Sequence, residues 1–78
     1  MTTKYKGSDH HQKAARFFEL AAKHHREAAR QHEAGHVERA AHHAQIASGH
    51  ALHGVEQSAQ ASKYHASQHD AETPAEEA

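Results

Sequence analysis

The chain of 78 residues has no cysteine, no tryptophan, a single proline and no long apolar run. Without cysteine, disulfide bonds cannot stabilise the fold. A helix that spans a bilayer needs about 20 apolar residues in a row, and every apolar segment of this chain is much shorter. The polar N-terminus lacks the apolar stretch of a signal peptide. If the chain is complete, these absences predict a cytoplasmic protein with no membrane partner.

An excess of charge of one sign is also missing. Nine Lys and Arg residues stand against 10 Asp and Glu residues, which gives a formal net charge of −1 with neutral histidine. The two signs are interspersed, so the sequence has neither a basic stripe for nucleic acid nor a polybasic membrane patch. We therefore expect no nucleic-acid partner.

Large apolar side chains are scarce. The hydrophobic share is 36%, and alanine supplies 18 of the residues counted in it. Because alanine buries little area, a monomer of this size would have difficulty offsetting its chain entropy. Small scaffolds without disulfides gain stability from a bound metal or a partner subunit, and both remain open here.

Histidine is the residue in excess, at 12 of 78 positions. A heptad of two His or Phe residues, two variable residues, two alanines and a basic residue occurs at 10–16, 17–23 and 24–30. The intervening residues are good helix formers, and Ser8 and Asp9 are good N-cap residues. Gly35 stands where a helix C-terminus would turn, and helical composition then resumes.

These signals predict an all-α fold, an antiparallel αα-hairpin within 8–70. We expect a flexible N-terminal arm over 1–7, a helix over about 9–34, a turn at Gly35 and a helix over about 36–70. The acidic segment 71–78 is expected to be a disordered tail.

The helical period predicts an inward face on each helix. On the first helix it comprises His11, Ala14, Ala15, Phe18, Ala22, His25, Ala29 and His32. On the second helix it comprises His36, Ala40, Ala44, Ala47, Ala51, Gly54, Ser58, Ala61 and His65. A second seam, which includes Phe17, Leu20, Ile46 and Tyr64, would remain exposed on one hairpin. We therefore expect a homodimer that forms a four-helix bundle.

If the chain folds back at Gly35, a residue of the first helix lies opposite the residue of the second helix for which the two residue numbers add up to roughly 68. This places His25 beside His43. Buried polar groups without partners are costly, and a metal ion can satisfy several imidazoles together. Chelating pairs also occur within the second helix at spacings of three and four residues. The predicted metal ligands are His25, His43, His32, His36, His50, His53, His11, His65 and His69. Neutral imidazole suits Zn, Ni, Cu and Co ions.

Catalytic interpretations find little support, and we expect no enzyme. A di-iron bundle needs Glu-x-x-His motifs on inward faces, and the only such motif, Glu33 to His36, lies across the turn. No serine lies in a strained elbow, which disfavours a catalytic triad. Haem held by His25 and His43 is disfavoured because the alanine-rich stripe could not enclose a porphyrin.

Two functions remain. The first is binding of a divalent transition metal, as a buffer, a store or a metallochaperone. The second is a non-catalytic structural or interaction bundle with histidine-based pH sensitivity. Acidification toward about pH 5 would move the formal net charge from −1 to about +11, and like charges would drive the bundle apart.

The paired histidines and alanines at 10–15 and 24–29, the segment Ala40-Ala41-His42-His43 and the Gly-centred turn also carry a resemblance. Over roughly residues 9–69 the chain resembles short histidine-rich bacterial proteins of uncharacterised function. It departs from their pattern at Phe17-Phe18, where another His pair would be expected. The resemblance implies no particular activity, so the functional interpretation depends on the residues themselves.

Overall fold

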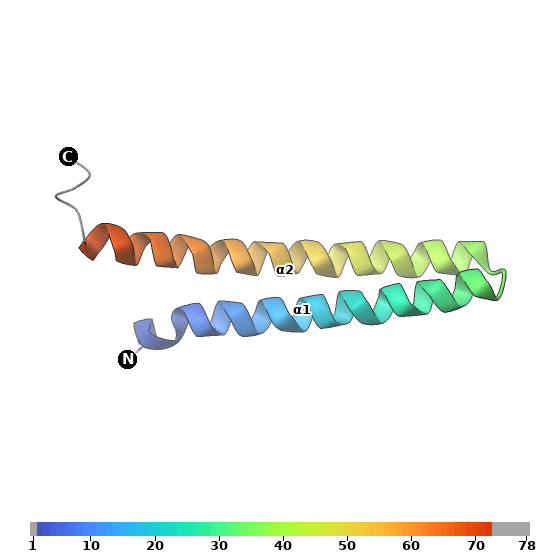
Figure 1. Cartoon of the computed structure of the whole chain (residues 1–78), viewed down its shortest axis with the longest axis horizontal. Coiled ribbons are helices and arrows are strands. Elements are labelled where there is room, and N and C mark those ends of the chain that lie inside the picture. Colours follow the sequence, from blue (N-terminus) through green and yellow to red (C-terminus); the bar gives the residue numbers. More distant parts are fainter. Residues whose placement is uncertain (1, 73–78) are drawn as a thin grey trace.

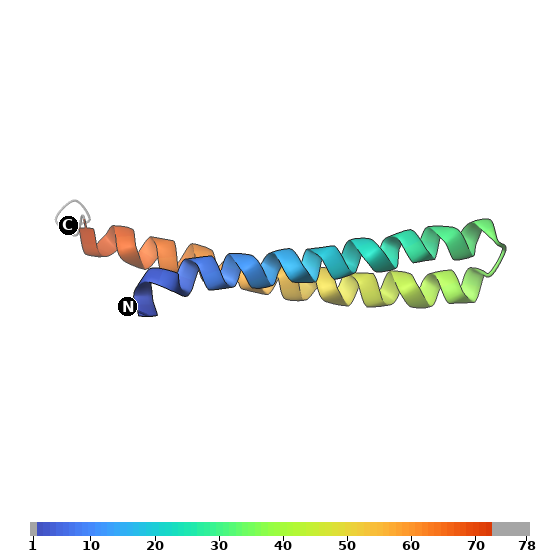
Figure 2. The ribbon, with the colours of Figure 1, turned by 90° about the horizontal axis from the view of Figure 1, so that it is seen from below.

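The computed structural model describes residues 2–72, with side chains described for 7–70. Two helices, α1 (Thr2–Glu33) and α2 (Val37–Glu72), pack antiparallel as a hairpin (Figure 1). They cross at a shallow angle along their length (Figure 2). The predicted all-α hairpin is confirmed. Within the described residues, neither helix has a stretch long and apolar enough to cross a membrane.

Helix α1 begins earlier than expected, at Thr2 rather than near residue 9. The segment 2–7, interpreted from the sequence as part of a flexible arm, contains no proline that would interrupt a helix. Its one glycine, Gly7, lies against the second helix, since a Cβ there would be 3.6 Å from Cδ2 of Tyr64. At the other end α2 includes Ala71 and Glu72, and the rest of the predicted tail, 73–78, lies outside the described residues.

The turn forms where the sequence predicted it. Gly35 has a φ of 85°, a left-handed conformation that glycine adopts without steric cost. The amide of Gly35 donates to the carbonyl of His32 (3.0 Å), and the amide of His36 donates to that of Gln31 (2.8 Å). These two bonds are the Schellman pattern that ends a helix. The carbonyl of His36 then accepts the first bond of α2, from the amide of Ala40 (3.0 Å).

The core between the helices consists of small residues repeated every seven positions. The buried alanines are Ala14, Ala21, Ala28, Ala40, Ala47 and Ala61. Gly54 is buried at the corresponding heptad position of α2. No large side chain is fully buried among the described residues. The helices therefore pack closely with little apolar area removed from water, in the manner of a coiled-coil pair.

The predicted inward face of the second helix is correct at its buried small residues, Ala40, Ala47, Gly54 and Ala61. The predicted inward face of the first helix is correct at Ala14 and wrong at most of its other positions. Ala21 is buried, whereas Ala15 and Ala29 are exposed. Each repeat offers two adjacent alanines, and the structure buries the first of each pair. The residues that alternate with these alanines at the contact are half-buried, and they are His10, Phe17 and His24. Of these, Phe17 was expected in the second, exposed seam.

The two glycines inside α2 have different surroundings, which predicts different effects of alanine. A Cβ at Gly49 would meet no atom within 4 Å, whereas one at Gly54 would lie 2.8 Å from Cζ of Phe18. We expect Gly49→Ala to stabilise the hairpin by about 0.5–1 kcal/mol, because alanine is the better helix former. Gly54→Ala should gain less, or destabilise, because the Phe18 ring must move. Thermal melts followed by circular dichroism test this, and equal stabilisation by both variants would contradict the packing.

Candidate functional site

Three pairs of side chains lie level across the helix contact: His10 with Gln57, Phe17 with His50, and His24 with His43. Successive pairs are seven residues apart on each helix and run in opposite directions along the chain. All three lie within one residue of the register expected from folding about Gly35, so that register is confirmed. The pairs place polar and aromatic rings between the layers of small residues.

His24 of α1 and His43 of α2 are in direct contact across the two helices. Their Nδ1 atoms lie 3.1 Å apart, and their rings stack with centroids 5.3 Å apart at 24°. In the neutral state one ring donates its Nδ1–H and the other accepts, which requires opposite tautomers. The pair therefore has a polar contact that exists only while at least one ring is unprotonated at Nδ1.

A third imidazole adjoins this pair. The ring of His50 stacks on that of His24, with centroids 5.6 Å apart, and lies 6.3 Å from the ring of Phe17 on its other side. Its buried Nδ1 has no hydrogen-bond partner among the described residues. A buried polar atom without a partner is costly, so this nitrogen is suited to a ligand or a water molecule. We refer to His24, His43 and His50 as the imidazole cluster.

The surroundings of His24 favour the neutral form of its ring. Its pKa is lowered from the ordinary value of 6.5, first by desolvation and then by the positive charge that His43, His50, Lys23 and His42 carry when protonated. Burial and like charges both disfavour the imidazolium form. A neutral ring keeps a nitrogen lone pair that can bind a metal ion.

Glu27 is the nearest carboxylate along this part of α1. It lines a depression of about 270 Å³ together with Lys23, His24, Arg30 and His43. Its pKa is lowered, first by a hydrogen bond from Gln31 and then by one from Arg30. Each of these two donors bonds a different carboxylate oxygen, so Glu27 stays ionised and balances the local positive charge.

The predicted ligand His25 does not face His43. Its side chain is exposed, and its neighbour His24 occupies the inward position instead. The prediction of this pair was therefore wrong by one residue on α1, because it followed the wrong alanine of each pair. His43 lies where it was expected.

The remaining predicted ligands are mostly exposed. His11, His32 and His36 are solvent-accessible. The pair His65 and His69 is also exposed, with ring centroids 4.4 Å apart.

His53 lies at the edge of the cluster. Its ring centroid is 5.1 Å from that of Phe17, and its Nδ1 is 3.3 Å from Oε1 of Glu56. Over the part of the chain that is described, no group of three or more histidine or carboxylate side chains has the arrangement of a metal site. Among the described residues, predicted histidines are thus brought together at two places, in the contacts of His43 and His50 with His24 and in the pair His65 and His69 within α2.

His24 is the inward histidine that the sequence analysis did not select. The positions 10, 14, 17, 21, 24, 28 and 31 follow the alternating spacing of four and three residues typical of a coiled-coil seam, but the neighbouring positions 11, 15, 18, 22, 25, 29 and 32 follow it equally. The same spacing in α2 passes through His43 and His50.

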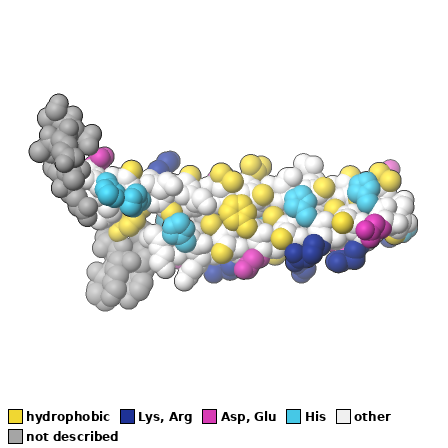
Figure 3. Space-filling view, viewed as in Figure 1, with side chains coloured by type: hydrophobic (Ala, Val, Ile, Leu, Met, Phe, Trp, Pro, Cys, Tyr) yellow, Lys and Arg dark blue, Asp and Glu magenta, His cyan; other side chains and the backbone are white. Residues whose placement is uncertain are grey.

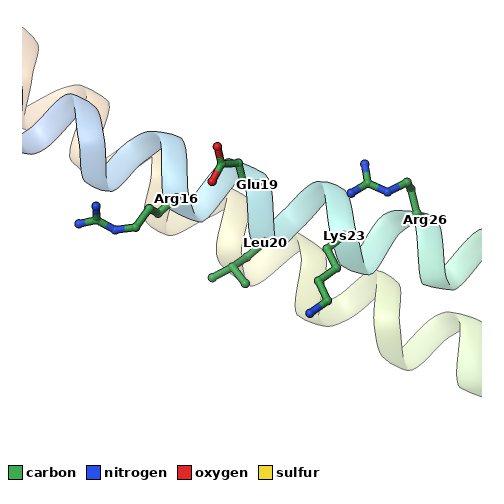
Figure 4. Close-up of a pocket in the computed structure, with 5 residues that line it drawn as sticks. All are labelled: Arg16, Glu19, Leu20, Lys23 and Arg26. Carbon is green, nitrogen blue, oxygen red and sulfur yellow. The ribbon is translucent and has the colours of Figure 1, made fainter.

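A second depression lies on α1 alone. It is lined by Arg16, Glu19, Leu20, Lys23 and Arg26. Figure 4 shows that these side chains extend from one helix in different directions, with Glu19 and Arg26 directed away from Leu20 and Lys23. They do not converge on a common point, so this surface has no chemistry comparable to the imidazole cluster.

Comparison with family models, curated proteins and solved structures finds no match for this chain.

Proposed function

We propose that the protein binds a divalent transition-metal ion between His24 and His43, as a non-catalytic buffer, store or metallochaperone. The observation that carries the proposal is the 3.1 Å separation of the two Nδ1 atoms. Two imidazole nitrogens at about 2.0–2.1 Å from one tetrahedral zinc ion would lie about 3.3–3.4 Å apart. In a square-planar copper or nickel site the same separation would be about 2.9 Å. The pair therefore needs little rearrangement to hold either kind of ion.

His50 supports this site. Its unpartnered Nδ1 lies beside the pair, so a change of its side-chain rotamer could bring a third imidazole to the ion. The remaining positions would be filled by water, which leaves the ion exchangeable. Exchangeable coordination suits buffering or delivery better than permanent structural binding.

The test is calorimetric titration of Zn(II), Ni(II) and Cu(II) at pH 7.5 into protein prepared without an affinity tag. We expect micromolar or tighter binding and a loss of about tenfold or more in affinity for His24→Ala and for His43→Ala, since each removes one of two direct ligands. The sequence provides matched controls, because His25→Ala and His42→Ala remove the exposed neighbours of the same two residues. Circular dichroism verifies that all four variants keep the hairpin.

Equal losses in all four variants would contradict the assignment and would indicate diffuse binding by the histidine content. No binding by the unaltered protein would remove the proposed function altogether.

A second candidate function is a helical module whose stability responds to pH. The observation that favours it is the lowered pKa of His24. Because the folded state binds a proton at His24 less readily than the unfolded chain does, acidification lowers the stability of the folded state. This function requires no metal, so the two candidates are distinguished by thermal melts with and without metal at constant pH.

We also propose that two hairpins pair into a four-helix bundle. The support is the composition of the core, which has alanine and glycine but no large buried side chain among the described residues. A chain with so small a core gains stability by burying further apolar area against a partner.

A further inference from the structure

One broad side of the hairpin has alanine, larger apolar, serine and histidine side chains, and among the described residues its only acidic or basic side chain is that of Glu38, close to the turn. From α1 it takes His11, Ala15, Phe18, Ala22, His25, Ala29 and His32. From α2 it takes Val37, Ala41, Ala44, Ser48, Ala51, Leu52, Val55, Ser58, Ala59 and Ser62. We refer to this surface as the neutral face.

The helical period and the packing place these residues on one side. Each set lies on the same flank of its helix, next to the buried heptad positions, and antiparallel packing turns corresponding flanks toward the same side. The ring of Phe18 from α1 lies over Gly54 of α2, so the two sets form one continuous surface. Figure 3 shows hydrophobic and histidine side chains over both helices in this view, with charged side chains gathered mainly along the outer edge of α1.

The neutral face exposes the large apolar side chains that the core lacks. Val37, Leu52 and Val55 are 61%, 66% and 55% exposed, and Phe18 is 42% exposed. Single exposed apolar residues are ordinary, but a continuous patch on a small protein indicates an interaction site.

The area of this face matches that of a stable interface. The part of α1 over 7–33, which lies alongside α2, is about 40 Å long, and two helices packed side by side are about 20 Å wide. The neutral face therefore covers about 800 Å². Specific protein interfaces bury about 800 Å² on each partner.

We infer that the occupant of the neutral face is the neutral face of a second copy of this chain. This inference rests on the proposed pairing of hairpins and locates its surface. A twofold contact places the same patch on both sides, and a patch whose only charged side chain lies near the turn meets itself with little like-charge repulsion. It also offers no cation to a nucleic acid or an anionic lipid.

The consequence for the metal site is specific. The depression beside His24 and His43 is lined by Lys23, Glu27 and Arg30, which lie on the opposite flank of α1 from the neutral face. A second copy on the neutral face therefore leaves the imidazole cluster of each chain open to solvent, and each chain binds its own ion.

The test uses single-cysteine variants, because the chain has no cysteine of its own. Leu52→Cys and Ala59→Cys place a thiol on the neutral face, and Gln60→Cys places one on an exposed position of the other side. The rate of alkylation by iodoacetamide is measured in the full-length chain from low micromolar to near-millimolar protein, with sedimentation velocity in parallel. We expect the first two rates to fall by about tenfold as the chains pair, while the third stays constant.

The use of two neutral-face variants covers the case in which Leu52→Cys itself weakens pairing. If the chains pair and only the thiol of Gln60→Cys is protected from alkylation, the choice of face is overturned and the proposed bundle stays intact. A single-chain mass at every concentration, with no protection, would overturn both. Protection of Leu52→Cys at single-chain mass only after neutral lipid vesicles are added would assign the face to a lipid surface instead. None of these outcomes bears on the metal site, which the calorimetric titrations test separately.

Discussion

Replacing Ala47 with glutamate is expected to abolish the hairpin. Ala47 has no exposed surface and lies in the close-packed layer between the helices. A glutamate there must either bury its carboxylate without a partner or force the helices apart. Leaving a buried charge unpaired costs about 3–5 kcal/mol, which is comparable to the whole stability that a core of this size supplies.

Circular dichroism and thermal melting at pH 7.5 measure this effect. The helical signal of Ala47→Glu should be largely lost at 25 °C, because isolated helices without tertiary packing are marginal in water. Gln60→Glu is the matched control, since it introduces the same residue at an exposed position of the same helix, away from the neutral face, and should melt like the unaltered protein. A cooperative melt of Ala47→Glu at the unaltered temperature would show that the alanine layer does not hold the helices together.

Acidification is expected to destabilise the hairpin through His24. The pKa of His24 is lowered in the folded state from its ordinary value of 6.5. Above that value both folded and unfolded chains hold a neutral ring, so the full stability is present. As the pH falls below 6.5 the unfolded chain takes up the proton first, and stability is lost until the pH reaches the lowered pKa of the folded state.

The measurement is the melting temperature between pH 7.5 and 5.0, with a chelator present to exclude metal. His24→Ala should show a shallower decline than the unaltered protein, because it removes the group whose proton uptake differs between the two states. His25→Ala, which alters an exposed neighbour, should keep the original slope. Identical slopes in all three proteins would contradict the role of His24 in the pH response.

The fold could be predicted because its determinants are local in the sequence. Gly35 marks the turn, and only a residue without a Cβ adopts its φ of 85° without strain. The seven-residue repeat of alanine and aromatic or histidine residues indicates two packed helices, and folding about a single turn fixes which layers meet. The register was therefore correct to within one residue.

The inward side chain at the candidate site could not be predicted from the same pattern. Each repeat contains two adjacent alanines and two adjacent histidines or phenylalanines, so two faces of α1 satisfy the spacing equally well. The choice depends on contacts with α2, where the ring of Phe17 packs near His50 and that of Phe18 lies over Gly54. These contacts bring His24 rather than His25 to His43. The tautomers of the pair depend on the same tertiary contact and have no signal in the sequence.

The proposed metal site is tested most directly by long-range ¹H–¹⁵N NMR spectra of the histidine rings, recorded at pH 7.5 before and after one equivalent of Zn(II). The ¹⁵N shift of a ring nitrogen identifies whether it is protonated, free or metal-bound, so each ligand atom is observed individually. We expect the Nδ1 atoms of His24 and His43 to change to metal-bound shifts, while the rings of His25 and His42 stay unchanged. Small changes distributed evenly over all 12 histidines, with no ring fully converted, would contradict a site built on the 3.1 Å contact between the two helices.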